Sequence, residues 1–226
     1  LMGISWGGFN CLQVAALRPP SLKAIYSVCS TDDRYSDDVH YMGGCLLNEN
    51  ISWGATMSTF AMRPPDPDVV GDRWYDMWLQ RLENAPNLVA KWMSHQTRDQ
   101  QWTHGSVCED YNTIQAAVYA VGGWADGYTN SVLRLCEGIN APFRGLIGPW
   151  SHAYPWKAKP SPMINGLKDL CRWWDHWLKN LDTGSMEEPK LRMWMQDSVP
   201  PLTSYSERPG RWVSEASWPC PNIVAK

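Results

Sequence analysis

The sequence predicts an α/β fold, in which strands buried on both faces alternate with helices. Two largely apolar runs, Ile114–Val121 and Pro142–Ile147, are typical of parallel strands that helices cover on both faces. A Gly-rich turn, Gly3–Gly8, leads directly into an amphipathic segment, as where a strand passes into a helix. In Ser161–Asn180, apolar residues recur at helical spacing.

Residues 1–30 predict a strand end, a tight turn, a helix and a second strand. We expect Leu1-Met2 to be the end of a strand. Gly7–Arg18 carries one apolar helical face, and Pro19-Pro20 ends the helix. Leu22–Ser30, with its β-branched and aromatic residues, predicts the next strand.

Residues 31–105 differ in character and predict a helical insertion. The stretch is rich in Trp, Met and charged residues and contains a proline cluster, Pro64–Pro67. Asp72–Leu82 places large apolar residues at helical spacing, and Leu88–Arg98 is a second helical candidate.

After residue 105 the sequence returns to alternating strands and helices. Tyr128–Ile139 predicts the helix between the two apolar strands. For the later helix Ser161–Asn180, Ser161 is the expected N-cap and Pro162 the first helical residue.

Residues 186–226 change character again and predict the opening of an all-β module. Leu191–Met195 and Gly210–Ser214 are short strand candidates separated by turn-rich sequence. We therefore expect an α/β core at residues 1–30 and 106–185, interrupted by the helical insertion and followed by the start of a β domain.

Charge and composition exclude several classes of partner. The net charge is −3 and no long run of Lys or Arg occurs, so neither a nucleic acid nor an anionic membrane is an expected partner. No apolar stretch approaches the roughly 18 residues of a membrane span. The 7 cysteines lack a C-x-x-C pair and predict buried free thiols, not a disulfide framework or a zinc site, which favours a reducing compartment such as the cytoplasm. We expect neither a metal nor a cofactor. The sequence leaves open whether the protein forms a homo-oligomer.

The motif Gly3-Ile4-Ser5-Trp6-Gly7 fits G-x-S-x-G, which sets a serine on a sharp turn between strand and helix. Small residues on either side avoid a collision across that turn. The hydroxyl then lies at a helix N-terminus, whose dipole favours negative charge. The pattern predicts Ser5 as a nucleophile and the backbone N–H of Trp6 as an oxyanion donor. The alternative is a Gly-rich turn with a structural role.

A serine hydroxyl needs a base to act as a nucleophile, and 5 histidines are candidates. Three of them fall in the predicted insertion, and His176 lies within a Trp-rich helix, where a packed structural role is expected. His152 follows the strand Pro142–Ile147 in a rigid loop, at the edge where ligands meet an open α/β sheet. We expect His152 to be the base; the alternative is a loop histidine without a partner.

The expected acid is Asp126, which follows a buried strand and precedes His152 by 26 residues, enough for one helix and one strand. Proteins with this serine motif run serine, acid, histidine along the chain. Asp32 and Asp33 are competitors, since they also follow a strand; for them the alternative is a turn or a cap salt bridge. Asp110 precedes its strand and would lie at the wrong end of the sheet.

These motifs resemble those of the CocE/NonD hydrolases, a group that includes cocaine esterase, the glutaryl-cephalosporin acylases and the Xaa-Pro dipeptidyl-peptidases. The resemblance covers nearly the whole chain. It rests on four motifs: Gly3–Phe9, Val121–Tyr128, Ile147–His152 and Arg172–Lys179. The tail, Leu191–Met195 followed by Arg211–Pro219, resembles the start of that family's C-terminal jelly-roll.

The resemblance implies a partial α/β-hydrolase fold with a helical cap insertion and the start of a β jelly-roll domain. It implies a catalytic triad of Ser5, Asp126 and His152. It also implies that residues 31–105 cover the acyl pocket and that Tyr128 lines it. Such enzymes hydrolyse carboxylic esters or amides through an acyl-enzyme, so we expect a small-molecule ester or amide, or a short peptide, as the substrate.

The family pattern also shows what this sequence lacks. One oxyanion donor in the family is the backbone N–H after the serine, here Trp6; the other is a tyrosine hydroxyl upstream of the motif, where the family also has several strands. We therefore expect a fragment of a longer protein. Xaa-Pro dipeptidyl-peptidase action stays open, with Asp37, Asp38 or Glu49 as anchors for a free amino terminus unless they are solvated loop charges. A non-catalytic or inactive fragment is the remaining alternative.

Overall fold

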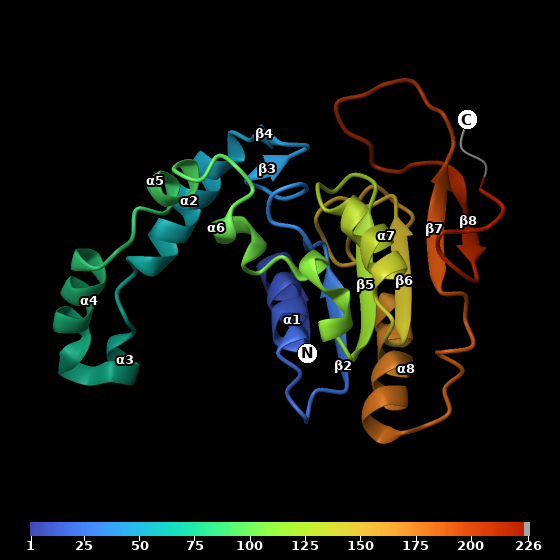
Figure 1. Ribbon diagram of the computed structural model, residues 1–226, viewed down its shortest axis with the longest axis horizontal. Coiled ribbons are helices and arrows are strands. Elements are labelled where there is room, and N and C mark those ends of the chain that lie inside the picture. Colours follow the sequence, from blue (N-terminus) through green and yellow to red (C-terminus); the bar gives the residue numbers. More distant parts are fainter. Residues whose placement is uncertain (224–226) are drawn as a thin grey trace. The chain divides into compact units, whose positions relative to one another are not determined.

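The computed structural model describes residues 1–223, which form two compact units (Figure 1). The first unit joins Leu1–Asp33 to the chain from Gly105 onward and contains the large sheet. The second unit is Arg34–His104 and is mainly helical.

The first unit is built on a six-stranded sheet with the order β1-β2-β5-β6-β7-β8. The strands are β1 (Met2–Ile4), β2 (Ala24–Val28), β5 (Ala117–Gly123), β6 (Phe143–Gly148), β7 (Leu191–Gln196) and β8 (Gly210–Glu215). Neighbours from β1 to β7 pair in parallel, and β8 runs antiparallel to β7. Every residue of β2, β5 and β6 is buried, as in parallel sheets covered on both faces. The predicted α/β fold with a parallel sheet is confirmed.

Helices cover both faces of this sheet. They are α1 (Trp6–Ala16), α7 (Thr129–Gly138) and α8 (Gly166–Lys179). On one face, Leu12 of α1 and Leu135 of α7 share an apolar core with the sheet. On the other face, Leu170 and Trp173 of α8 pack in a second core. Two short 3₁₀ turns, η2 (Val107–Glu109) and η3 (Tyr111–Thr113), precede β5.

The predicted start of the last helix, at Ser161, is wrong. The N-cap of α8 is Asn165, whose side chain accepts a hydrogen bond from the N–H of Lys168 at 3.4 Å. Ser161 instead donates its N–H to the carbonyl of Ser206 at 2.8 Å and accepts from the N–H of Arg208 at 2.9 Å. Because both of its backbone groups pair with a distant segment, Ser161 is held in an extended bridge and does not begin the helix.

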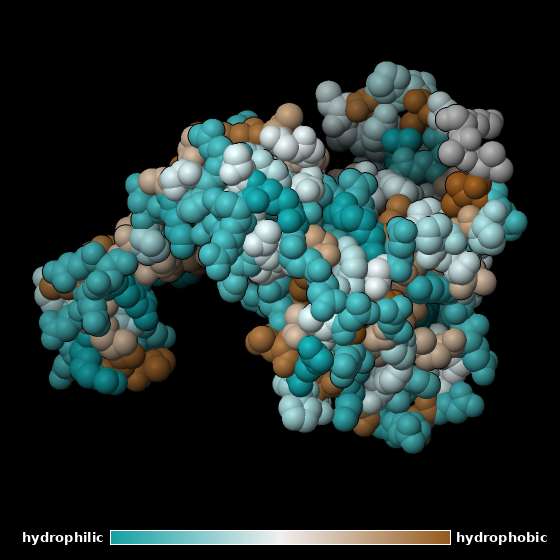
Figure 2. Space-filling view, in the orientation of Figure 1, coloured by the Kyte–Doolittle hydropathy of each residue, from teal (hydrophilic) through white to brown (hydrophobic). Residues whose placement is uncertain are grey.

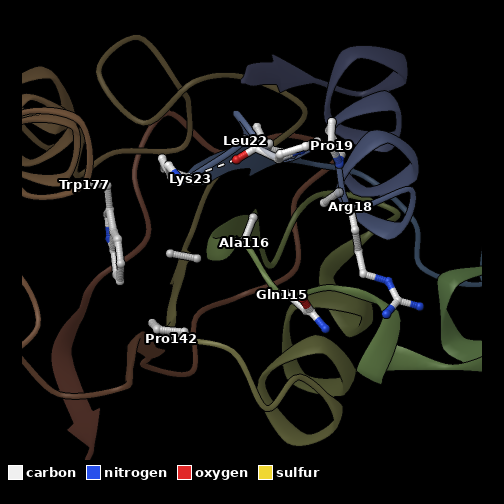
Figure 3. A pocket seen from close by; sticks show the side chains of 11 residues that line it. Arg18, Pro19, Leu22, Lys23, Gln115, Ala116, Pro142 and Trp177 are labelled. Atoms are coloured by element: carbon white, nitrogen blue, oxygen red, sulfur yellow. Dashed lines mark hydrogen bonds between the residues drawn. The ribbon is translucent and has the colours of Figure 1, made fainter.

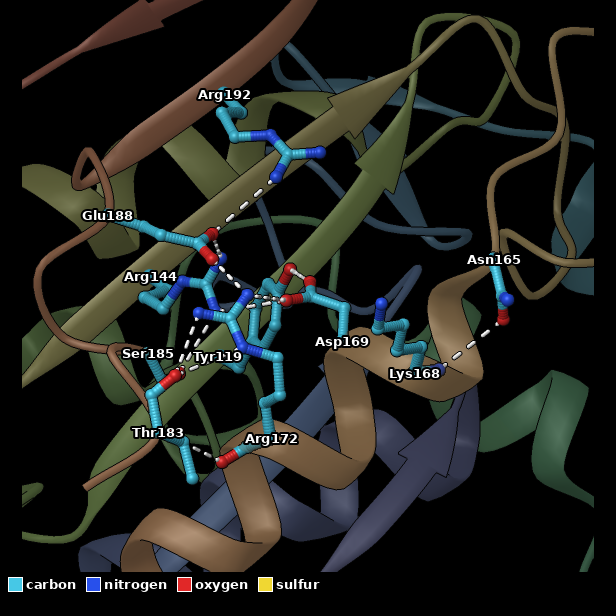
Figure 4. A network of polar contacts seen from close by, with 10 residues as sticks. All are labelled: Tyr119, Arg144, Asn165, Lys168, Asp169, Arg172, Thr183, Ser185, Glu188 and Arg192. Carbon is cyan, nitrogen blue, oxygen red and sulfur yellow. Dashed lines mark hydrogen bonds and ion pairs between the residues drawn. The ribbon is translucent and has the colours of Figure 1, made fainter. Parts of the chain in front are cut away.

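A network of charged side chains fixes α8 against the sheet (Figure 4). Arg144 of β6, whose side chain is 3% exposed, lies 3.2 Å from Asp169 of α8 and also pairs with Glu188. Tyr119 of β5 donates to Asp169, and Arg172 of α8 pairs with Glu188. The buried guanidinium is therefore paired on both sides, as a charge in this position requires.

The last two described strands extend the central sheet. β7 pairs with β6, β8 pairs with β7, and both belong to the same compact unit as the other strands. The expected domain boundary at residue 186 therefore lies just before β7, which is a further strand of the same sheet. That these strands also open a jelly-roll domain stays a prediction.

The second unit consists of a small hairpin and short helices. They are β3 (Tyr41–Met42), β4 (Cys45–Leu46), α2 (Glu49–Ala61), α3 (Pro67–Val70), η1 (Gly71–Arg73), α4 (Trp74–Glu83), α5 (Leu88–Met93) and α6 (Gln100–Thr103). Its core is formed by Tyr41, Trp92 and Trp102. Figure 2 shows an apolar patch at α3, where Val69 is 80% exposed. Among the described helices of both units, none has the length and apolar character needed to cross a bilayer.

Candidate active site

Ser5 lies between β1 and α1 in a backbone conformation that residues other than glycine rarely adopt. Its φ is 58° and its ψ is −121°. Its N–H donates to the carbonyl of Val28 at 2.8 Å, and its carbonyl accepts from the N–H of Phe9 at 2.9 Å. The strained turn is thus tied both to the neighbouring strand and to the helix that follows, which is the strand–turn–helix setting that the G-x-S-x-G motif predicts.

The glycines around Ser5 do not have equal roles. A Cβ on Gly3 would lie 2.2 Å from the carbonyl carbon of Gly7, so no side chain fits there. A Cβ on Gly8 would lie 2.8 Å from the carbonyl oxygen of Val28. A Cβ on Gly7 would meet nothing within 4 Å. The argument for small residues on both sides therefore holds at Gly3, but on the helix side it applies to Gly8 and not to Gly7.

Asp126 and His152 form a hydrogen-bonded pair. Nδ1 of His152 lies 2.8 Å from Oδ1 of Asp126. The acid follows β5 and the histidine follows β6, and these parallel strands are neighbours, so both loops leave the same edge of the sheet. The side chain of Asp126 is 4% exposed, whereas that of His152 is 43% exposed. A carboxylate bonded to Nδ1 leaves Nε2 as the ring atom that can accept a proton.

The loops that carry this pair are packed backbone against backbone. The N–H of Ala125 donates to the carbonyl of Trp150 at 3.0 Å. A Cβ on Gly123 would lie 2.1 Å from that same carbonyl oxygen, so glycine is required for the close approach. Nε1 of Trp124 donates to the carbonyl of Trp194 in β7 at 2.6 Å. The acid loop is therefore fixed on one side to the histidine loop and on the other to β7.

The competing acid, Asp32, has other partners. It is fully buried; Arg134 of α7 approaches its Oδ1 to 2.5 Å, and the hydroxyl of Tyr111 donates to its Oδ2 at 2.5 Å. Burial, and then the charge of Asp32, raise the pKa of Tyr111, so this hydroxyl stays protonated. Next to Asp32, the hydroxyl of Thr31 donates to the carbonyl of Asp33 at 2.8 Å in a local turn. Asp32 therefore holds α7 in place through a salt bridge. This agrees with the structural alternative to a catalytic role that the sequence left open for Asp32.

The end of β2 lies between Ser5 and the Asp126–His152 pair. Val28, which accepts the N–H of Ser5, is followed by Cys29. One ligand atom each from Cys29, Asp126 and His152 lies within 4.8 Å of the others. Among the described residues the structure shows no hydrogen bond from the Ser5 hydroxyl to His152; catalytic contacts of this kind often close only when substrate binds. The sequence motifs do not include Cys29, whose only sequence signal is its place near the end of the predicted strand Leu22–Ser30.

The two remaining predicted site residues lie at the start of helices on the same edge. The ring of Tyr128, at the start of α7, has its centroid 5.7 Å from that of His152. Trp6 is the first residue of α1, so its backbone N–H lies in the first turn of the helix, at the positive end of the helix dipole.

The hollow shown in Figure 3 lies at the other end of the strands, where β2, β5 and β6 begin, and is not part of this site. Its volume is about 380 Å³, and its lining consists mostly of residues that precede or begin strands, together with Ala15 of α1 and Trp177 of α8. Lys23 precedes β2, Ala117 begins β5 and Pro142 precedes β6. Ligands of open α/β sheets meet the carboxyl ends of the strands, which is the edge that carries Asp126 and His152.

The acidic residues considered as anchors for a free amino terminus all belong to the second unit. Asp37 is 3% exposed and Asp38 is 8% exposed, so the expectation of solvated loop charges is wrong for both. Asp38 accepts the N–H of Val39 at 2.7 Å, a local bond that helps to compensate its burial. Glu49 is exposed and accepts a hydrogen bond from Ser52 at 2.8 Å.

A family model described as X-Pro dipeptidyl-peptidase (S15 family) matches residues 1–154, a range that includes Ser5, Asp126 and His152. The chain belongs to this family.

The match with two curated relatives covers only a small part of each relative's length. A protein of Mycobacterium bovis named as a serine esterase is 30% identical over 119 residues, which is 50% of this chain and 17% of that protein. A protein of Mycobacterium tuberculosis with the same kind of name matches with the same identity and coverage. The matched half of this S15 chain thus covers only 17% of the length of each of these curated relatives.

Solved structures of low sequence identity share the fold. A CocE/NonD family hydrolase from Staphylococcus aureus has a TM-score of 0.71 at 17% identity, covering 97% of this chain and 34% of that one. An α-amino acid ester hydrolase has a TM-score of 0.61 at 15% identity, covering 96% of this chain and 38% of that one. These matches confirm the α/β-hydrolase fold of this S15 chain and its resemblance to the CocE/NonD group.

Proposed function

We propose that this chain carries the catalytic residues of a serine hydrolase, which cleaves carboxylic esters or amides through an acyl-enzyme. The observation that carries the proposal is the Asp126–His152 hydrogen bond at 2.8 Å, formed at the sheet edge where β1 ends in the Ser5 turn. The family match and the relatives named as esterases support a hydrolase of this kind.

Each step uses the tautomer of His152 in which Nδ1 donates a hydrogen bond to Asp126 and Nε2 can accept a proton. Nε2 of His152 takes the proton of Ser5 while Oγ attacks the substrate carbonyl. The tetrahedral intermediate collapses, the C–O or C–N bond breaks, and the proton on Nε2 passes to the leaving group. Water then repeats the sequence on the acyl-enzyme, with His152 again as the base, and releases the acid.

The surroundings of the three residues fit these roles. Because the Asp126 side chain is 4% exposed, its charge is little screened by water and stabilises the imidazolium that forms on His152. The backbone N–H of Trp6, at the first turn of α1, donates to the oxyanion. Tyr128 forms part of the acyl pocket beside His152. The family resemblance is the support for assigning residues 31–105 as the cap of that pocket.

The test is pre-steady-state hydrolysis of a p-nitrophenyl ester. We expect a burst of p-nitrophenol in the parent protein and no burst in Ser5→Ala, because the acyl-enzyme cannot form without Oγ. Ser21→Ala, which removes an exposed hydroxyl from the turn before β2, is the matched control and should keep the burst. A burst of parental size in Ser5→Ala would rule the proposal out.

A second candidate function, removal of Xaa-Pro dipeptides, is favoured by the description of the matching family. Such an enzyme recognises a free amino terminus, so it should cleave Gly-Pro-p-nitroanilide and reject the N-acetylated form. Equal cleavage of the two substrates would exclude the peptidase function. Cleavage of simple esters but of neither anilide would support the esterase function instead.

A further inference from the structure

Three side chains of different chemistry meet at the edge of the sheet that carries the candidate site. Cys29 follows β2, Asp126 follows β5 and His152 follows β6, and one ligand atom of each lies within 4.8 Å of the others. Their donor atoms are sulfur, oxygen and nitrogen. Because the three come from three separate loops, no C-x-x-C or similar spacing announces them, and the sequence predicts no metal site.

The carboxylate of this cluster is weakly satisfied. Asp126 uses Oδ1 for His152; its Oδ2 is buried, and the one group of the described cluster left to face this carboxylate is the thiol of Cys29, a weak hydrogen-bond donor. The side chain is 4% exposed, so water does not readily satisfy this oxygen. Buried carboxylate oxygens normally have strong partners, so this oxygen, together with the sulfur beside it, offers ligand atoms to a cation.

The thiol beside it is kept protonated by the same surroundings. Burial is the largest cause that raises the pKa of Cys29, and the charge of Asp126 is the next. A divalent cation bound between the sulfur and the carboxylate oxygens sets a positive charge against the buried carboxylate.

We propose that Cys29, Asp126 and His152 bind a thiophilic divalent cation of the Zn²⁺ class, and that this cation inhibits the hydrolase. Cysteine, histidine and aspartate are the usual ligands of Zn²⁺, and three protein ligands leave a fourth position for water. With bonds of about 2.0–2.3 Å, tetrahedral Zn²⁺ sets its ligand atoms roughly 3.3–3.6 Å apart. The cluster lies within 4.8 Å, so a contraction of about 1 Å completes the site.

The part that moves is His152, because its side chain is 43% exposed and reaches the cation from the solvent side. Cys29 is fixed at a strand end, where its N–H donates to the carbonyl of Val121 at 2.8 Å. A cation on Nδ1 breaks the hydrogen bond to Asp126, and a cation on Nε2 blocks the atom that takes the serine proton. Inhibition therefore rests on the proposed function, whereas binding does not.

The binding test uses Cd²⁺, whose bond to thiolate gives an ultraviolet charge-transfer band. The background carries Cys45→Ser and Cys171→Ser, which remove the two exposed thiols. We expect one equivalent of Cd²⁺ to produce the band in this background and in its Cys11→Ala control, which removes a buried thiol in α1. The band should be lost in Cys29→Ala. Its persistence there would overturn the proposal.

A second variant and a second readout keep the test decisive. Because φ at Cys29 is 48°, glycine fits there without strain, so Cys29→Gly is expected to fold even if Cys29→Ala does not. Zn²⁺ should inhibit ester hydrolysis, and either variant should need about 10–100-fold more Zn²⁺ for the same inhibition. Equal sensitivity of parent and variants would overturn the proposal. A Cd²⁺ band at Cys29 without inhibition would support the site and contradict the role of His152 as the base.

Discussion

Replacement of Asp126 by asparagine tests the geometry of the site with little change in shape. In the structure, Oδ1 of Asp126 accepts the hydrogen bond from Nδ1 of His152 at 2.8 Å. The amide of Asp126→Asn can present an N–H to Nδ1 instead. The ring proton then moves to Nε2, the nitrogen that must accept the proton of Ser5, and the imidazolium loses its negative partner.

The size of the effect follows from how the carboxylate is held. Because its side chain is 4% exposed, water does not replace the lost interaction, and we expect a fall in kcat of about 10⁴-fold. At about 1.36 kcal/mol for each factor of ten, this is roughly 5 kcal/mol of transition-state stabilisation. The free energy of unfolding should change little, since asparagine has the same shape.

The assay is steady-state hydrolysis of a p-nitrophenyl ester, with a thermal melt of each variant to confirm that it folds. A loss of kcat smaller than about tenfold in folded Asp126→Asn would refute the reasoning, because it would mean that this carboxylate does not set the tautomer of His152.

Three further predictions concern the surroundings of the site and the second unit. Asp32→Asn breaks the buried pair with Arg134 and should lower the free energy of unfolding by about 3 kcal/mol while leaving kcat unchanged; a loss of kcat comparable to that of Asp126→Asn would make Asp32 the acid. Gly3→Ala should abolish activity and lower Tm because its Cβ meets the Gly7 carbonyl carbon at 2.2 Å, whereas Gly7→Ala should keep both, and equal effects would contradict the described turn. Burial lowers the pKa of His40 from 6.5 to about 4, so the folded state resists a proton that the unfolded state accepts. Stability should therefore fall by up to about 3 kcal/mol as pH drops from 6.5 to 4. Chemical denaturation at several pH values should show a weaker pH dependence in His40→Gln, and identical profiles would contradict the burial of a neutral imidazole.

The local sequence predicted the two strands that precede the site residues. A strand that is buried on both faces is apolar at nearly every position, and this run of apolar residues is visible in the sequence. Ile114–Val121 and Pro142–Ile147 indicated β5 and β6, which lie one to three residues away from the predicted limits. The loops that follow them carry Asp126 and His152, and their order along the chain was enough to predict which side chains to compare.

Features that depend on distant contacts could not be predicted in this way. Ser161 has the form of an N-cap, but its backbone pairs with residues 206 and 208, far along the chain. The burial of Asp37 and Asp38 likewise depends on packing within the second unit. Cys29 meets the acid and the histidine only because β2 lies beside β5 in the sheet, which a count of spacings does not reveal.

The most direct test of the central claim is mass spectrometry of the protein after reaction with a fluorophosphonate probe. If the strained turn, Asp126 and His152 together activate Ser5, the probe should attach to the peptide that contains Ser5, and His152→Ala should greatly slow the labelling. A protein that hydrolyses esters while its Ser5 peptide stays unlabelled would contradict the account.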